Sequence, residues 1–146
     1  MANYYGWTKT NYFRVTDENA YEKLFSGLRA CDAELHDFTK TENGIIYHGF
    51  GAEGSIDYYL EPDEEDAEPS FDLFTENLQK ILPEDEAFIL IETGHEKLRY
   101  LTGFAIVVTK TKITSCELEN WAHNTAFDIV KEANPNTVPQ IKYTYG

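Results

Sequence analysis

The sequence predicts an α+β domain with a mainly antiparallel sheet and about three helices. The chain has 146 residues, of which 42% are hydrophobic and 14% aromatic, enough for one globular domain with its own core. Several short runs alternate between apolar and polar residues, as strands do. Three longer segments instead place apolar residues three and four apart, which is typical of amphipathic helices.

The chain is expected to begin with a strand and a helix. Residues 11–15 (NYFRV) alternate in character and predict the first strand. Either Thr16 or Asp17 is suited to cap a helix over residues 16–28, because both side chains can accept a hydrogen bond from the free N–H groups of the first turn. Gly27 weakens the last turn of this helix.

A hairpin and a further strand are expected next. Asn43-Gly44 is typical of two-residue hairpin turns, because both residues tolerate positive φ. It separates one arm around Leu35–Phe38 from a second arm at Ile45–Phe50. Residues 55–61 (SIDYYLE) then predict another short strand before an acidic loop at residues 61–68.

A second helix and a group of three strands follow the loop. Pro69-Ser70 begins a helix that ends before Pro83. Its expected apolar face consists of Phe71, Phe74, Leu78, Ile81 and Leu82. AFILIE and LRYLTGFAIVVT predict two strands joined by a turn at TGHEK that contains Gly94, and KITSCEL predicts a third strand.

A closing helix is predicted over residues 117–134, followed by an irregular tail at residues 135–146. The helical residues expected to face the core are Trp121, Ala122, Ala126, Ile129 and Val130. The predicted order is therefore β-α-β-β-β-α-β-β-β-α in a single domain, residues 1–146.

The net charge of −14 is concentrated in one segment. Between Glu53 and Glu86 there are thirteen acids and one base, a net −12, whereas the other 112 residues together carry −2. Such a field repels nucleic acid and anionic lipid and steers association with basic protein surfaces. Direct binding of DNA or RNA, which needs a basic surface, is therefore not expected.

Signals for several other functions are missing from the sequence. No apolar run approaches the roughly 20 residues of a membrane helix, and no secretory signal precedes the first elements. Cys31 and Cys116 lie far apart, which predicts two reduced thiols in a cytoplasmic protein. There is no nucleophile elbow and no phosphate-binding loop. No cofactor is expected.

Two weaker chemical hypotheses remain open. His36 and His48 could face each other across the Asn43-Gly44 hairpin, with nearby acids completing a metal site or a small enzyme's active site. The acids of residues 61–68 could bind Ca²⁺, although the spacing of a 12-residue calcium loop is not present.

The acidic segment itself suggests protein binding. Carboxylates three and four apart on a helix are separated by about 5–6 Å, a distance comparable to that between successive phosphates of a DNA strand. A rigid surface of this kind can imitate a nucleic-acid backbone and bind a basic nucleic-acid-binding protein, such as a nuclease. The predicted partner-binding residues are Asp57, Tyr58, Tyr59, Glu61, Asp63, Glu64, Glu65, Asp66, Glu68, Asp72 and Glu76.

Two segments also carry a resemblance. YYGWTKTNYFRVTD and ETGHEKLRYLTGFAIVVT resemble segments of small acidic proteins found on mobile elements of Gram-positive bacteria. Such elements carry antirestriction and anti-CRISPR proteins, several of them DNA mimics. The resemblance implies an inhibitor of a host nuclease system and assigns no functional residue. The remaining alternative is an acidic assembly module whose charge serves only solubility.

Overall fold

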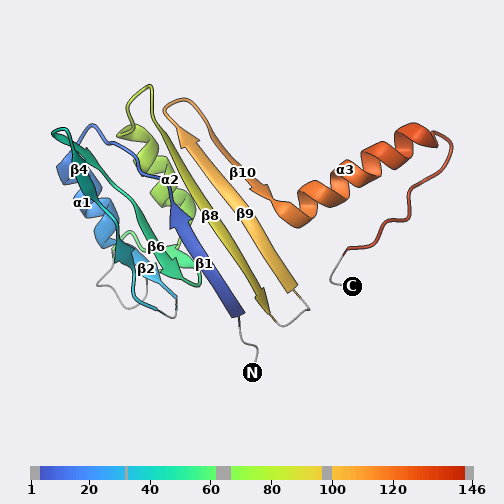
Figure 1. The fold of residues 1–146 in the computed structure, drawn as a ribbon, viewed down its shortest axis with the longest axis horizontal. Coiled ribbons are helices and arrows are strands. Elements are labelled where there is room, and N and C mark those ends of the chain that lie inside the picture. Colours follow the sequence, from blue (N-terminus) through green and yellow to red (C-terminus); the bar gives the residue numbers. More distant parts are fainter. Residues whose placement is uncertain (1–3, 32, 62–66, 97–99, 144–146) are drawn as a thin grey trace.

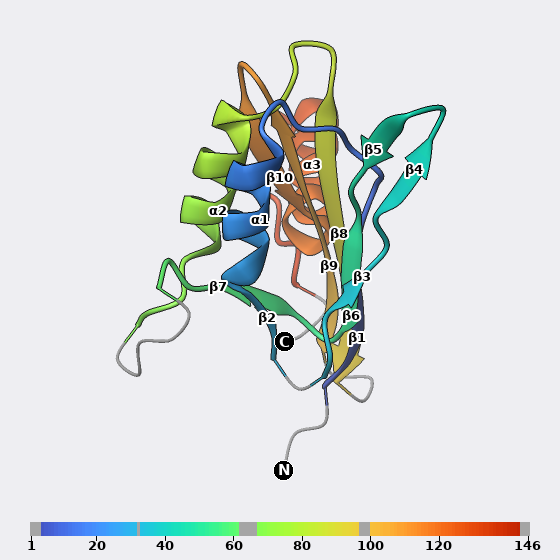
Figure 2. The same ribbon diagram turned by 90° about the vertical axis from the view of Figure 1, so that its left-hand side faces the viewer.

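The computed structural model describes residues 4–31, 33–61, 67–96 and 100–143. Within these ranges the chain is an α+β domain with a six-stranded sheet, two small two-stranded sheets and three helices, so the predicted fold class is confirmed. Helices α1 (Glu18–Ser26) and α2 (Phe71–Lys80) lie side by side on one face of the large sheet (Figure 2). The third helix, α3 (Leu118–Ala133), extends away from the edge of the sheet (Figure 1).

All pairs of neighbouring strands are antiparallel. The large sheet contains, in spatial order, β10 (Ile113–Glu117), β9 (Tyr100–Thr109), β8 (Ala87–Glu96), β1 (Tyr4–Thr10), β6 (Phe50–Glu53) and β3 (His36–Asp37). The small sheets pair β2 (Leu28–Ala30) with β7 (Ile56–Tyr58), and β4 (Lys40–Glu42) with β5 (Ile45–Tyr47). The first strand in the chain therefore lies inside the sheet, between β8 and β6.

The predicted position of the first strand is wrong. The strand is β1, at Tyr4–Thr10, and the expected residues 11–15 form a connection to α1 in which Phe13 is fully buried. The alternation of β1 misled the prediction because the strand buries polar Thr8 and Thr10 while Tyr5 and Trp7 point outward. Thr8 is accommodated inside because its hydroxyl donates a hydrogen bond of 2.7 Å to the carbonyl of Gly54.

The predicted hairpin is confirmed, with Asn43 and Gly44 at φ 54° and 78°. It continues in one register beyond the turn, because Lys40 lies opposite Tyr47 and His36 lies opposite Gly51. The pairing between the two arms is interrupted midway, so the predicted hairpin is divided into four short strands, β3 to β6. The three-residue strand β2 was not predicted.

The turn expected at TGHEK is also misplaced. Strand β8 runs through Gly94 to Glu96, with Gly94 opposite Thr102 and Glu96 opposite Tyr100. The glycine in this segment is therefore a strand residue, and the pair β8–β9 is longer than predicted.

The core lies between the large sheet and helices α1 and α2. Phe13, Phe50, Phe74 and Phe88 are fully buried and meet at ring-centroid distances of 5.1–6.0 Å, mostly edge to face. The apolar face predicted for α2 is confirmed, since Leu78 is also fully buried.

The closing helix is confirmed as a helix, but the prediction that its apolar residues face the core is wrong. None of its residues is buried, and Trp121 and Ile129 are 57% and 61% exposed. The reason is local: β10 ends at Glu117 and α3 begins at Leu118, so no loop allows the helix to turn back onto the sheet. The described part of the predicted irregular tail contains neither helix nor strand, and Ile141 accepts a hydrogen bond of 2.9 Å from His123 Nε2.

Candidate functional site

The acidic residues between Glu53 and Glu86 do not form the single face that the charge count suggested. Glu53 lies in β6 opposite Trp7, on the sheet face away from α1 and α2. Glu86 lies at the start of β8, with its side chain largely buried against Arg14. Both ends of the segment are therefore separated from the acids on α2.

Of the described acids in this segment, Glu61, Glu68, Asp72 and Glu76 lie on the side of the molecule formed by the two packed helices. We define the acidic layer as the exposed carboxylates of this side, namely Asp17, Glu18, Glu22, Glu61, Glu68, Asp72 and Glu76. Among the residues that the structure describes, Glu22, Glu68, Asp72 and Glu76 form no ion pair. The predicted residues Asp63, Glu64, Glu65 and Asp66 lie outside the described residues. Within residues 61–80 the sequence contains eight acids and one base, a net −7.

The first three predicted partner-binding residues belong to the fold. Tyr58 is only 3% exposed and packs on Phe74 at a ring-centroid distance of 5.4 Å, so its prediction as a partner contact is wrong. Burial raises the pKa of Tyr58. Asp57 is half-buried and accepts a hydrogen bond of 3.3 Å from the thiol of Cys31. Tyr59 is half-buried, and its backbone N–H donates to the carbonyl of Gly27.

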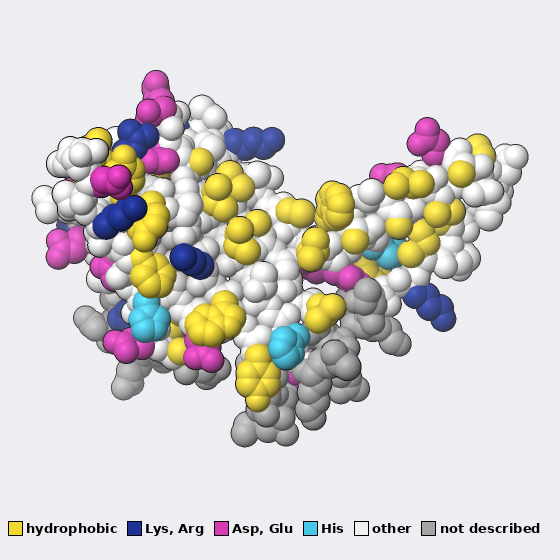
Figure 3. Space-filling model, viewed as in Figure 1, with side chains coloured by type: hydrophobic (Ala, Val, Ile, Leu, Met, Phe, Trp, Pro, Cys, Tyr) yellow, Lys and Arg dark blue, Asp and Glu magenta, His cyan; other side chains and the backbone are white. Residues whose placement is uncertain are grey.

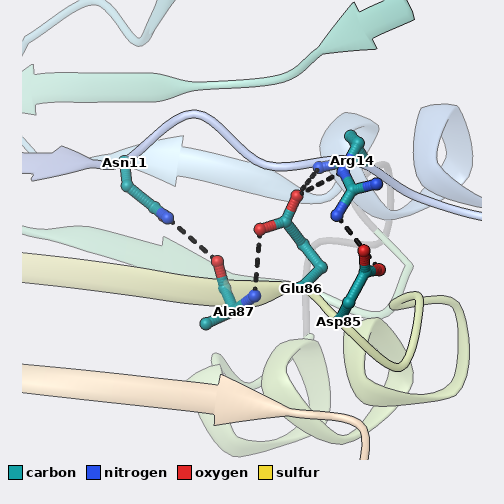
Figure 4. A network of polar contacts seen from close by, with 5 residues as sticks. All are labelled: Asn11, Arg14, Asp85, Glu86 and Ala87. Carbon is teal, nitrogen blue, oxygen red and sulfur yellow. Dashed lines mark hydrogen bonds and ion pairs between the residues drawn. The ribbon is translucent and has the colours of Figure 1, made fainter.

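Two further acids hold the connection after β1 against the start of β8 (Figure 4). Glu86 Oε2 accepts hydrogen bonds from the backbone N–H and Nε of Arg14 at 3.0 and 2.8 Å, and Oε1 accepts from the N–H of Ala87 at 3.0 Å. Asp85 pairs with Arg14 Nη2 at 3.1 Å. The hydrogen bond that Arg14 donates to Glu86, opposed by desolvation and supported by the charge of both acids, raises the pKa of Arg14. These carboxylates act in the fold and are not part of the acidic layer.

The two histidines proposed to face each other do not do so. The hairpin register places His36 opposite Gly51 and Thr39 near His48, so the two rings lie on opposite faces of the hairpin. His36 is exposed and stacks on Phe38, whereas His48 is buried beneath α1. In the described parts of the chain, no group of three or more His, Cys, Asp or Glu residues is placed to hold a metal ion.

His48 instead belongs to a small polar cluster between α1 and the hairpin. Its Nε2 lies 2.6 Å from Glu18 Oε1 and its Nδ1 lies 3.2 Å from Thr39 Oγ1, while its ring stacks on Tyr21 at 4.0 Å. A hollow of about 240 Å³ adjoins these residues. Because both ring nitrogens already have partners, the ring is fixed in place and neither nitrogen is left for a metal ion.

The sequence did not reveal the residues that complete this cluster. Glu18 and Tyr21 lie in the helix predicted over residues 16–28, and neither was among the predicted site residues. Helical spacing places Tyr21 on the same side of α1 as the core, but it does not indicate that a strand histidine 27 positions away would stack on it. Only the docking of α1 on the hairpin brings Glu18 and His48 together.

Replacing Tyr21 with phenylalanine is expected to reduce the loss of stability at high pH. Burial, aided by the charges of Asp37 and Glu18, raises the pKa of Tyr21. The folded state therefore keeps the phenol neutral, while the unfolded chain ionises above about pH 10. Tyr21 thus contributes to the fall in unfolding free energy as the pH rises through the ordinary tyrosine pKa.

The Tyr21 hydroxyl is buried and has no hydrogen-bond partner among the described residues, so Y21F should change stability at neutral pH by less than about 1 kcal/mol. Urea denaturation at neutral pH and above pH 10 measures both effects, and Tyr12→Phe, at an exposed tyrosine, serves as the matched control. A loss of more than about 2 kcal/mol at neutral pH would show instead that the hydroxyl makes a stabilising hydrogen bond.

Comparisons of the chain with known proteins assign no function to these residues. No helix in the described ranges is long and apolar enough to cross a membrane. No protein-family model matches the chain, and searches of the curated proteins and of the solved structures give no match.

Proposed function

We propose that this protein is a non-enzymatic protein-binding protein, whose acidic layer occupies the basic surface of a nucleic-acid-binding partner. In its most specific form, the protein inhibits a host DNA-targeting nuclease system by DNA mimicry, as antirestriction and anti-CRISPR proteins do. The observation that supports this proposal is the set of exposed carboxylates on and before α2 that form no ion pair among the described residues.

The arrangement on α2 is suited to this role. Asp72 and Glu76 lie one helical turn apart and are both exposed, while Phe74 and Leu78 anchor the same helix in the core. Carboxylates with this spacing are about 5–6 Å apart and are held by a rigid element. They need no folding on binding, so little conformational entropy opposes association. Long-range attraction between a net −7 segment and a basic channel also accelerates encounter at low salt.

Charge reversal on α2 is expected to weaken partner binding at least tenfold. The variant is D72K/E76K, and the partner is obtained by affinity capture from a host lysate and then purified. Wild-type protein should displace DNA from this partner, and its affinity should fall steeply with salt because charged surfaces carry the association. The fourfold reversal at Asp63, Glu64, Glu65 and Asp66 extends the test to the acidic loop.

The chain contains a matched control for this substitution. Asp128 and Glu132 are also exposed acids four residues apart on a helix, but they lie on α3, outside the acidic layer. D128K/E132K makes the same change in net charge and should alter affinity less than twofold. Thermal unfolding of both variants controls for the helix-terminal position of Asp72. Equal losses in the two variants, or no loss in either, would refute recognition by the acidic layer.

A further inference from the structure

The face of the large sheet opposite α1 and α2 has no covering element among the described residues (Figures 1 and 2). We call this surface the open face. The strand register places on it Tyr5, Trp7, Lys9, Ile89, Ile91, Thr93, Leu101 and Ala105. Tyr5, Trp7, Ile91 and Leu101 are all at least half exposed. An apolar surface of this extent on a sheet is typical of an interaction site.

The side-chain pattern of β1 supports this conclusion. A strand with one solvated face normally turns its apolar residues inward and its polar residues outward. In β1 the order is reversed, because Thr8 and Thr10 are buried while Trp7 lies on the open face. Trp7 and Ile91 also line a hollow of about 460 Å³ between β1 and β8. The open face therefore has the composition of a buried surface.

Helix α3 carries the second uncovered apolar surface. Leu118, Trp121, Ala122, Ala126 and Ile129 recur at spacings of three and four residues and form a stripe along the helix. Hydrophobic side chains gather on both the sheet and α3 on the side of the molecule seen in Figure 3. The two surfaces are thus displaced sideways from each other but face the same direction.

The helix cannot cover the open face of its own chain. It follows β10 without a loop, and its first residue is already fixed against the sheet. A Cβ on Gly103 would lie 3.1 Å from Leu118 Cδ2, so the glycine provides the space in which Leu118 packs on β9. From this point α3 leads away from the sheet.

We propose that a second copy of this chain covers both surfaces, in a two-fold symmetric dimer in which α3 of each protomer packs on the open face of the other. A single two-fold rotation about an axis between the two surfaces places each α3 on the open face of the other chain. This is possible because the two surfaces lie side by side and face the same direction. The helix would then occupy on this face the position that α1 and α2 occupy on the other, giving a helix–sheet–helix arrangement of layers.

The charge distribution favours this association between two chains that each carry −14. Residues 118–143 contain three acids and two bases, and the open face carries Lys9 and Glu53, so both contact surfaces are nearly neutral. The acidic layer lies on the opposite face of the sheet, where the two copies do not meet.

The exposed apolar side chains supply a large part of the contact area that a dimer needs. A stable interface covers about 800 Å² on each partner. Burial of Tyr5, Trp7 and Trp121 would cover roughly 300 Å² per protomer, since each is more than half exposed. The exposed aliphatic residues Ile91, Leu101, Leu118 and Ile129 enlarge this area.

Sedimentation equilibrium tests the dimer. Wild-type protein should dimerise with a dissociation constant of about 1 μM or tighter. I129E should weaken dimerisation at least tenfold, whereas N120E, about 180° around the same helix, should not. Circular dichroism of both variants confirms that α3 is retained. A wild-type protein that is monomeric up to about 100 μM, or a dimer unaffected by I129E, would overturn the proposal.

A cross-linking experiment tests the arrangement of the two chains. Both native cysteines are first replaced by serine, and a T93C chain is mixed with an A122C chain in the presence of a short bifunctional thiol reagent. The mixture should give a covalent heterodimer, and the mixture of T93C with N120C should not, because Asn120 lies on the side of α3 opposite the stripe. Equal yields from both mixtures would overturn the proposed arrangement. Neither readout depends on a basic partner, so this proposal and the proposed function can fail separately.

Discussion

Replacing Phe88 with alanine is expected to lower the free energy of unfolding by about 4 kcal/mol. Phe88 is fully buried in β8, and its ring meets those of Phe13, Phe50 and Phe74 at 5.1, 6.0 and 5.9 Å. Alanine would remove the contacts to all three neighbours, and the rigid sheet on which they rest limits how far the cavity can collapse. Since small domains are stable by about 5–15 kcal/mol, this loss brings the protein close to unfolding.

The same substitution at Phe127 provides the matched control. Phe127 lies on α3 and is 36% exposed, so F127A should cost less than about 2 kcal/mol, below the range for the truncation of a fully buried aromatic residue. Denaturant titration measures both losses, and F88L, which retains more of the buried volume, should fall between wild type and F88A. If F88A and F127A cost the same, the aromatic cluster does not form the core described above.

Replacing Glu86 with alanine is expected to cost about 3 kcal/mol. The carboxylate accepts three hydrogen bonds, two of them from the backbone N–H groups of Arg14 and Ala87. Its removal leaves these two N–H groups and Nε of Arg14 without their acceptor in a partly buried place. Asn11 holds the same junction through hydrogen bonds to the carbonyl of Ala87 and the N–H of Ile89, so the start of β8 would loosen but stay attached.

The neighbouring residue Asp85 shows whether the effect comes from buried hydrogen bonds or from charge alone. Asp85 pairs with the same guanidinium but its side chain is 77% exposed, so D85A should cost at most about 1 kcal/mol. E86Q, which keeps the shape and one acceptor oxygen, should fall between E86A and wild type. Equal effects of D85A and E86A in urea denaturation would show that Glu86 acts only as a surface charge.

Local signals in the sequence predicted the elements whose stability is local. Helix α1 begins after Asp17, whose side chain accepts a hydrogen bond from Ala20 N–H, as its capping role predicted. The turn at Asn43-Gly44 has the positive φ values that these two residues permit. Helix α2 buries its predicted face because the same apolar spacing that identifies the helix also defines its contact surface.

Predictions failed where contacts between distant residues decide the outcome. The inward threonines of β1 hide a strand from hydrophobic periodicity, because Thr8 is satisfied by a carbonyl 46 positions away. The predicted pairing of His36 with His48 was wrong, because His36 lies opposite Gly51, three positions beyond His48. A shift by an odd number of residues moves a side chain to the opposite face of the hairpin. The stripe of α3 was correctly identified as apolar, but periodicity does not specify which surface covers it.

The sequence by itself determined the fold class, the helices and the concentration of charge before and along α2, since propensity, periodicity and charge are properties of neighbouring residues. The tertiary structure alone decided that Glu53 and Glu86 lie apart from the acidic layer and that Tyr58 is in the core. It alone shows that no described residue covers the apolar side of α3 or the open face, and that both lie on the same side of the molecule. These features depend on the order of strands in the sheet and on the direct connection of β10 to α3. Both determine where elements lie relative to one another, which the pattern of neighbouring residues does not specify.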